Sequence, residues 1–405
     1  MSSLTPFCSS FPTRPLKFVA PLRGEKVDAV PSDAEYIGLE QLESWTGRLS
    51  SVELQQRPEG GANVFTKEDV LFGKLRPYLA KGWVADRTGF CTTECLVLQP
   101  LDTDPRFLNY SLLTSEFVEA VNGSTYGSKM PRADWAFIGS VKVPCPPRSV
   151  QQRIANFLDE QTARIDALIA EKRALIARLQ EWRQAWLSEE LFQGAKYRET
   201  RLKFCLRASL QYGATESGDP EASGPRYIRI TDIRMDGTLT DEDAKYLTEE
   251  QASPYILEDE DVLFARSGAT VGKSFVYLQE MGRCAYAGYL IRAKLDKTLL
   301  LPRYLRLLTE THQYWAYLRG AETQSTIQNA SAEKYTNFAF PLPPVSVQKD
   351  VTNRLDVQIK RVEELVTHAT AHTERLSEYR SSLISAAVTG QLNVDDFQAR
   401  QLEAA

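Results

Sequence analysis

An internal repeat is the feature that most constrains the fold of this chain. The stretch "VPCPPRSVQQRIANFLDEQ" at 143–161 returns as "FPLPPVSVQKDVTNRLDVQ" at 340–358, so that identical residues such as Gln151 and Gln348 stand 197 positions apart. Each copy places two prolines before a long segment with helical periodicity. Because proline is tolerated in the first turn of a helix and not in its interior, each copy marks the start of a helix. The sequence therefore predicts two equivalent helices.

The repeat extends into the segments that precede these helices. "LKF" at 16–18 returns at 202–204, and "DVLF" at 69–72 returns at 261–264. The offset grows from 186 to 192 to 197 residues along the chain, which is typical of a shared framework whose loops differ in length. Short segments rich in Val, Ile, Leu, Phe and Tyr alternate with Gly, Pro and Asp, and a few helical stretches lie among them. We expect an α+β fold for each globular part.

The two long segments carry a heptad pattern in the same register, which predicts a coiled coil. The a positions fall at Leu158, Ile165, Lys172, Leu179 and Trp186 and at Leu355, Val362, Ala369, Leu376 and Leu383. The d positions fall at Ile154, Gln161, Leu168, Leu175 and Trp182 and at Val351, Gln358, Leu365, His372 and Tyr379. A helix of forty-odd residues is roughly 65 Å long, more than a globular domain needs, so we expect a spacer. Two such helices most simply pair antiparallel within the chain.

A chain of 405 residues is too long for one ordinary core. The expected organisation is a globular domain at 1–148, a spacer helix at 149–195, a second globular domain at 196–345, a second helix at 346–391 and a tail at 392–405. With 43% apolar and 25% charged residues, no membrane-spanning apolar run and no targeting pattern at its start, the chain is expected to be a soluble cytoplasmic protein without a membrane partner.

Metal and nucleotide sites are not expected. Cys91 and Cys95 lack a second cysteine pair, and His368 and His372 lack a third ligand. The stretch "GATVGKS" at 268–274 imitates a phosphate loop, but one residue is missing between its glycines and a strand-like segment follows it. An NTP-binding enzyme that uses Gly268–Ser274 is therefore the weakest alternative.

The duplicated "PPxSVQ" start of a heptad helix, after a globular part with "DVLF", resembles the DNA-specificity subunit of type I restriction-modification systems. The resemblance extends from about Leu16 to Leu392. It implies two target recognition domains that each read one half of a bipartite, asymmetric site in double-stranded DNA, and a coiled coil that recruits two methyltransferase subunits. Restriction and translocase subunits are further implied partners. The chain itself would be non-catalytic, with S-adenosylmethionine bound by the partner methyltransferase.

Phosphate binding depends on local clusters of Lys and Arg, so the net charge of −5 does not exclude DNA as a ligand. After "DVLF" both copies place two basic residues at matching positions, where we expect phosphate contacts, with a solvated loop as the alternative. The loops before the helices carry side chains that hydrogen-bond base edges. The candidate DNA-binding residues are Lys74, Arg76, Lys81, Ser124, Tyr126, Lys129 and Arg132 in the first copy and Arg266, Lys273, Ser274, Gln324, Ser325, Gln328 and Asn329 in the second.

Trp182 and Trp186 are expected in the seam between the helices, with exposed edges available to a partner protein. The leading hypothesis is a DNA-reading subunit. The alternative is a coiled-coil scaffold whose globular ends bind proteins, which the acidic composition favours slightly. Salt-dependent retention on DNA distinguishes the two.

Overall fold

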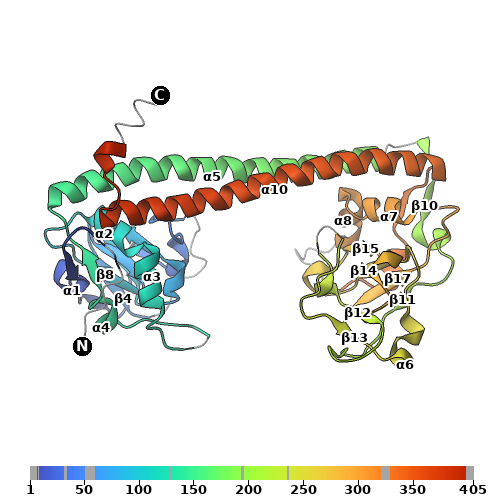
Figure 1. Cartoon of the computed structure of the whole chain (residues 1–405), viewed down its shortest axis with the longest axis horizontal. Coiled ribbons are helices and arrows are strands. Elements are labelled where there is room, and N and C mark those ends of the chain that lie inside the picture. The colour runs from blue at the N-terminus through green and yellow to red at the C-terminus, as the bar shows by residue number, and fades with distance from the viewer. Residues whose placement is uncertain are drawn as a thin grey trace. The chain divides into compact units, whose positions relative to one another are not determined.

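The structure is a computed structural model of the 405-residue chain. It describes residues 7, 9–31, 34–50, 60–127, 129–192, 196–234, 237–320 and 329–397. The chain divides into two units, Met1–Arg173 with Ala371–Ala405 and Ala174–Thr370. Each unit consists of one globular domain and one segment from each of the two long helices (Figure 1).

The first domain is built from short strands and helices that precede the long helix α5. Its strands are β1 (Thr13–Pro15), β2 (Lys26–Val27), β3 (Tyr36–Ile37), β4 (Ala62–Phe65), β5 (Val70–Gly73), β6 (Gly82–Val84), β7 (Gly89–Thr92), β8 (Cys95–Leu98) and β9 (Lys142–Pro144). Its helices are α1 (Leu16–Val19), η1 (Leu39–Gln41), η2 (Pro77–Leu79), α2 (Pro105–Leu112), α3 (Ser115–Asn122) and α4 (Trp135–Ile138), followed by α5 (Arg148–Leu191).

Two sheets form the core of the first domain. One has the order β2-β4-β7-β3, in which β3 and β7 run parallel, and the other has the antiparallel order β6-β5-β8. The "DVLF" segment forms β5, whose side chains are fully buried, as a continuous apolar run predicts. Helix α3 covers this strand, since the rings of Phe72 and Phe117 meet edge-on at 5.6 Å. A short ladder between β1 and β9 leads into α5.

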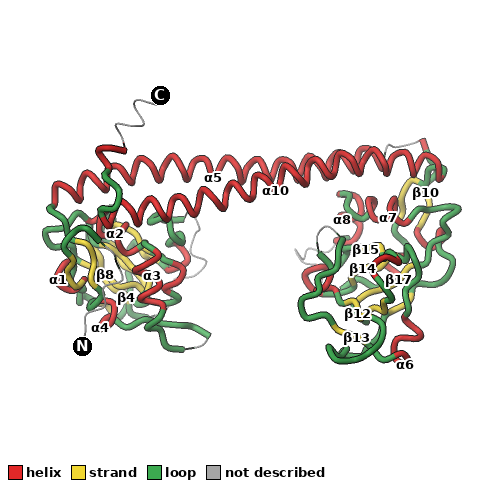
Figure 2. The backbone as a smooth tube through the Cα atoms, in the orientation of Figure 1, coloured by secondary structure: helices red, strands yellow, loops and turns green. Residues whose placement is uncertain are grey.

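The second domain has elements of the same kinds (Figure 2). Its strands are β10 (Glu199–Arg201), β11 (Gln211–Tyr212), β12 (Arg226–Ile228), β13 (Lys245–Tyr246), β14 (Val262–Ala265), β15 (Ser274–Val276), β16 (Cys284–Tyr286), β17 (Leu290–Ala293) and β18 (Ala339–Pro341). Its helices are η4 (Leu202–Cys205), η5 (Ile230–Asp232), α6 (Glu249–Ala252), η6 (Ser253–Tyr255), η7 (Gly268–Thr270), η8 (Gln279–Met281), α7 (Pro302–Leu308), α8 (His312–Arg319) and α9 (Ala332–Thr336), followed by α10 (Val345–Thr389).

Part of the strand pairing of the first domain recurs in the second. The sheets have the orders β11-β17-β14-β15 and β13-β12-β16, and the parallel pair β12–β16 corresponds to β3–β7. The second "DVLF" segment again supplies a central, fully buried strand, β14. The expectation of two similar α+β domains is therefore confirmed.

The repeated helix start has the same function in both domains. Gln151 and Gln348 are only 1% and 0% exposed. The side-chain oxygen of Gln151 accepts a hydrogen bond from the N–H of Asp104 at 2.8 Å, and that of Gln348 accepts one from the N–H of Leu301 at 2.9 Å. Each side-chain amide also donates to the carbonyl of the first proline of its pair, at 2.8 Å in both copies. Asp104 and Leu301 are the N-cap residues of α2 and α7, so each glutamine joins a long helix to a helix of its own domain.

The long helices run antiparallel within each unit. In the first unit Asp166 of α5 pairs with Arg380 of α10 at 2.9 Å. In the second unit Glu190 pairs with Arg354 at 3.0 Å, while the earlier α5 residue Arg183 lies beside the later α10 residue Glu363. The antiparallel coiled coil is therefore confirmed. Neither of these helices, nor any other in the described ranges, has an apolar stretch of membrane-spanning length.

The predicted seam is correct in its a row and wrong in much of its d row. The a residues Leu158, Ile165 and Val362 are buried. The d residues in the middle of the helices are exposed: Leu168, Leu175, Trp182, Leu365, His372 and Tyr379. The e row takes their place, as Ile169, only 8% exposed, illustrates. The sequence did not distinguish the two rows, because apolar residues flank the a row on both sides. An i, i+4, i+7 pattern fits a heptad as well as an i, i+3, i+7 pattern.

Candidate nucleic-acid interface

The two candidate loops of the first domain form one surface. The carbonyl of Lys74, directly after β5, accepts a hydrogen bond from the N–H of Ala133 at 3.0 Å. The N–H of Arg76 donates to the carbonyl of Pro131 at 2.7 Å. The loop that follows the "DVLF" strand therefore lies against the loop that precedes the long helix, an association that the sequence did not reveal.

The second domain joins its two loops by the same contacts. The carbonyl of Arg266 accepts a hydrogen bond from the N–H of Ala330 at 2.9 Å. The bridge between Ser267 and Asn329 corresponds to the bridge between Leu75 and Arg132 in the first domain. The backbone of the site is thus duplicated, whereas its side chains differ between the domains.

Several candidate side chains of the first domain are exposed. Tyr126 is 64% exposed, and Arg76 and Lys129 are also exposed. Arg76 adopts a left-handed backbone conformation with φ of +51°, which directs the chain into η2. Among the described residues no acid or hydrogen-bond acceptor pairs with the side chains of Arg76 or Lys129. These cations, with half-buried Lys74, are the available basic groups of this surface.

Other candidates of the first domain bind groups of the protein itself. Arg132 makes a forked contact with Glu94 at 3.0–3.1 Å, and this pairing raises the pKa of the guanidinium. The ammonium of Lys81 donates to the carbonyl of Leu39 at 2.5 Å, and burial lowers its pKa. The hydroxyl of Ser124 donates to the carbonyl of Val121 at 2.7 Å. These three side chains are less suited to DNA contact than the sequence suggested.

In the second domain the guanidinium of Arg266 lies over the ring of Tyr212, 4.9 Å from its centroid. Asn329 is exposed beside Ser267. Tyr212 and Tyr289, which is 66% exposed, are neighbours of this surface that the sequence reasoning missed. Of these two tyrosines, only Tyr289 could have been found from the sequence, because it lies in the turn that carries Glu94 in the first domain. The candidates Gln324, Ser325 and Gln328 lie outside the described residues.

Lys273 and Ser274 occupy a different part of the second domain. Both line a groove of about 820 Å³ between the domain and its helical segments, where the Ser274 and Thr309 hydroxyls are 2.7 Å apart. Lys273 is exposed. Its main chain occupies the same position as that of Lys81, because its carbonyl accepts a hydrogen bond from the N–H of Ala265. Gly268–Ser274 leads into strand β15, so the stretch lacks the helix N-terminus on which a phosphate loop depends.

The two tryptophans of α5 differ in their surroundings. Their rings stack at 5.5 Å with an interplanar angle of 4°. Trp182 is 49% exposed and lies outside the seam, whereas Trp186 is half-buried against the core of the second domain. Trp182 is therefore the one whose ring offers a large apolar face.

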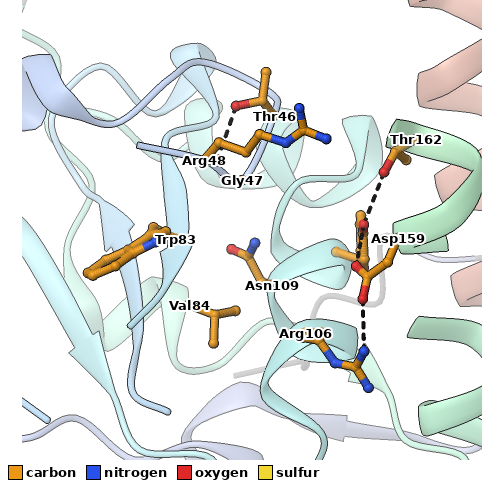
Figure 3. A pocket seen from close by; sticks show the side chains of 10 residues that line it. Thr46, Gly47, Arg48, Trp83, Val84, Arg106, Asn109, Asp159 and Thr162 are labelled. Atoms are coloured by element: carbon orange, nitrogen blue, oxygen red, sulfur yellow. Dashed lines mark hydrogen bonds and ion pairs between the residues drawn. The ribbon is translucent and has the colours of Figure 1, made fainter. Parts of the chain in front are cut away.

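A pocket of about 330 Å³ lies where α2 meets α5 in the first unit (Figure 3). The hydroxyl of Tyr110 donates to Asp159 at 2.8 Å, and burial raises the pKa of this phenol. Arg106 also binds Asp159 at 2.8 Å, and Arg303 repeats this ion pair with Asp356 at 2.6 Å in the second unit. The pocket is thus part of the junction between domain and helix.

Within the described ranges, no three His, Cys, Asp or Glu side chains come together as metal ligands. His368 and His372 are both exposed on α10. The surface around Lys74 in the first domain and the surface around Arg266 in the second each offer cations and hydrogen-bonding groups, which suit an anionic polymer better than a bond-breaking reaction.

Comparison with known proteins supports this assignment. The family model of the type I restriction modification DNA specificity domain matches residues 25–178. The specificity subunit of the type I restriction enzyme EcoDI of Escherichia coli is 24% identical over 152 residues, which cover 36% of this chain and 34% of the relative. The EcoKI specificity subunit of E. coli strain K12 is 23% identical over 314 residues, which cover 71% of this chain and 65% of the relative. The chain thus spans less than two thirds of the length of either.

The fold also has a solved counterpart. A chain from a structural study of complex assembly and conformational transition in the type I R-M system superposes with a TM-score of 0.74 at 19% identity, covering 94% of this chain and 98% of that one. At this identity the likeness concerns the fold. The chain is thus similar to type I restriction-modification DNA specificity subunits, in sequence to the family model over residues 25–178 and to the curated relatives, and in fold over most of its length.

Proposed function

We propose that the chain is the non-catalytic subunit through which a type I restriction-modification enzyme reads a bipartite, asymmetric site in double-stranded DNA. One observation carries the proposal. Both domains hold the same two loops together by the same main-chain hydrogen bond, at Lys74 and Ala133 and at Arg266 and Ala330. The side chains on these loops differ, which supports the reading of two unlike DNA blocks by one duplicated framework.

Charge and exposure are consistent with DNA as the ligand. The chain carries a net charge of −5, yet the joined loops of the first domain expose the cations Arg76 and Lys129 beside the acid Asp134. Basic side chains position a protein on the phosphates, while Arg, Asn and Tyr side chains also reach base edges. We propose that Lys74, Arg76 and Lys129 hold the backbone beside the first block.

The long helices hold the two reading domains apart in this proposal. They comprise 44 and 45 residues, which corresponds to about 65 Å at the rise of an α-helix. A spacer of this length fits two blocks separated by base pairs that the protein does not read. Sequencing the methylated sites made when one heptad is added to each helix tests this role, since the gap between the blocks should lengthen.

We further propose that two methyltransferase subunits dock on the helices. Exposed apolar side chains gathered on one surface mark sites of protein association. Leu175 and Trp182 supply such side chains in the second unit, as Tyr379 does in the first. S-adenosylmethionine and the catalytic groups belong to these partners in the proposal, restriction and translocase subunits complete the enzyme, and the assembly acts in the cytoplasm.

The function is tested by sequencing the methylated bases of a strain with and without this gene. We expect one bipartite motif to disappear with the gene, and an exchange of residues 1–148 with those of a relative to change one block only. The assembled complex should also release DNA steeply as salt rises, because phosphate contacts release counterions. An unchanged methylation pattern together with salt-independent retention would favour a protein scaffold instead.

A further inference from the structure

Arg266 is held both at its main chain and at its guanidinium. Its N–H donates to the carbonyl of Tyr289 at 2.9 Å, and its carbonyl accepts from the N–H of Ala330 at 2.9 Å. Its guanidinium lies 4.9 Å from the centroid of the Tyr212 ring. The main chain and the charged end of this residue are therefore both positioned before any ligand arrives.

Tyr212 is itself a fixed platform. It lies in β11, where it pairs with Ile291 of β17. Its hydroxyl accepts a hydrogen bond from the N–H of Ala332, the first residue of α9, at 3.2 Å. The residue remains 40% exposed while its main chain and its hydroxyl are held. A cation over such a ring gains a favourable interaction.

The donors of Arg266 remain available. In the part of the chain that the structure describes, no side chain or carbonyl accepts a hydrogen bond from its guanidinium, and no acid forms an ion pair with it. Arg132 of the first domain differs, because Glu94 occupies both of its donor directions. Tyr289, which takes the place of Glu94 in the second domain, carries no charge. The acid that pairs with Arg132 in the first domain is therefore replaced by an uncharged tyrosine in the second.

We propose that Arg266 determines specificity by reading a guanine in the DNA block bound by the second domain. The planar guanidinium presents parallel N–H groups that match the O6 and N7 acceptors of guanine in the major groove. The contact with the Tyr212 ring restricts the movement of the guanidinium, so less side-chain freedom is lost on binding. A phosphate contact, which the sequence suggested for Arg266, requires charge without this restraint. The inference rests on the proposed DNA-reading function.

The test compares the methylated sites made in cells by the full-length wild type and by Arg266→Lys. Lysine keeps the charge and loses the fork. We expect the preference for one guanine in one block to fall roughly tenfold to hundredfold, while the other block and the gap stay unchanged. Tyr212→Leu should relax the same position to a smaller extent, and Tyr212→Phe, which keeps the ring, should relax it least. Arg283→Lys, an exposed arginine of the same domain paired with Glu249, is the matched control and should leave the motif unchanged.

Two results would overturn the proposal. One is an unchanged motif with Arg266→Lys, provided that its thermal unfolding matches the wild type. The other is a uniform loss of binding to all sequences with Arg266→Ala, accompanied by a salt slope reduced by about one, which identifies a phosphate contact. Failure of the proposed function itself is recognised separately, because the wild type would then produce no bipartite motif at all.

Discussion

The two domains are attached to their helices identically at one junction and differently at another. At the helix starts each glutamine makes the same two contacts, with an N-cap N–H and with a proline carbonyl. At the second junction Arg380 of the first unit corresponds to Arg183 of the second, 197 residues earlier. Arg380 donates to the carbonyls of Trp45 at 2.8 Å and Thr46 at 3.2 Å and pairs with Asp166 at 2.9 Å.

Arg183 binds acidic side chains, whereas Arg380 also binds main-chain carbonyls of a loop. It donates to Glu310 and lies 4.0 Å from Glu363. The Arg380 side chain is 9% exposed, whereas the Arg183 side chain is 23% exposed beside the groove of about 820 Å³. The first unit encloses only about 330 Å³ at its corresponding junction. Duplication has thus kept the junction that starts each helix and allowed the other junction to diverge.

Substituting the two glutamines tests the shared junction and has the largest expected effect. Gln151→Leu and Gln348→Leu each leave a buried N–H and a buried carbonyl without partners. We expect each to lower the free energy of unfolding by about 2–4 kcal/mol, with faster hydrogen exchange at Asp104 or Leu301. Gln152→Leu, at an exposed neighbouring position, is the control and should change stability little. Unequal losses would show that the helix starts are not equivalent.

Substituting the two arginines tests the divergent junction. Arg380→Met removes a buried cation from Asp166 and from two carbonyls, and we expect a loss of about 2–3 kcal/mol in unfolding free energy. Arg183→Met should cost less than about 1 kcal/mol, because Glu310 keeps Arg306 at 3.7 Å and water reaches the groove. Urea unfolding of both variants measures the difference. Equal losses would contradict the contrast between the two junctions.

The smallest expected effect concerns the reading surfaces. Glu94→Gln removes the negative charge that holds Arg132, so the first domain gains an available cation. We expect DNA binding by the assembled complex to strengthen a few-fold at low salt, with a salt slope steeper by about 0.9 if one phosphate contact is added. Glu119→Gln is the control, since it removes an exposed acid from helix α3 of the same domain. Unchanged DNA affinity and slope for Glu94→Gln would show that Arg132 does not face the phosphates.

The helix starts were predictable because their signal is local. The prolines and glutamines are repeated letter by letter, and proline acts within one turn of a helix. The seam was only half predictable, since Leu168 and Ile169 are adjacent apolar residues and the covering partner decides which is buried.

The convergence of the loops was not predictable. The bond between Lys74 and Ala133 joins main-chain groups, which leave no trace in side-chain identity. The pairing of Arg132 with Glu94 likewise crosses 38 residues of sequence. Whether a basic residue is available to DNA therefore depends on distant acids that only the folded chain brings near.

The first unit is discontinuous in sequence, which affects its synthesis. Ile165 and Ile169 share a buried cluster with Leu383 and Ala387, and the N–H of Ser10 donates to the carbonyl of Thr389 at 2.9 Å. The ribosome makes the whole of Ala174–Thr370 between these partners, which takes roughly 10–40 s at bacterial elongation rates. Synthesis of the first unit thus begins before that of the second unit and ends after it. Its apolar helix face stays accessible to neighbouring nascent chains until translation passes Ala387.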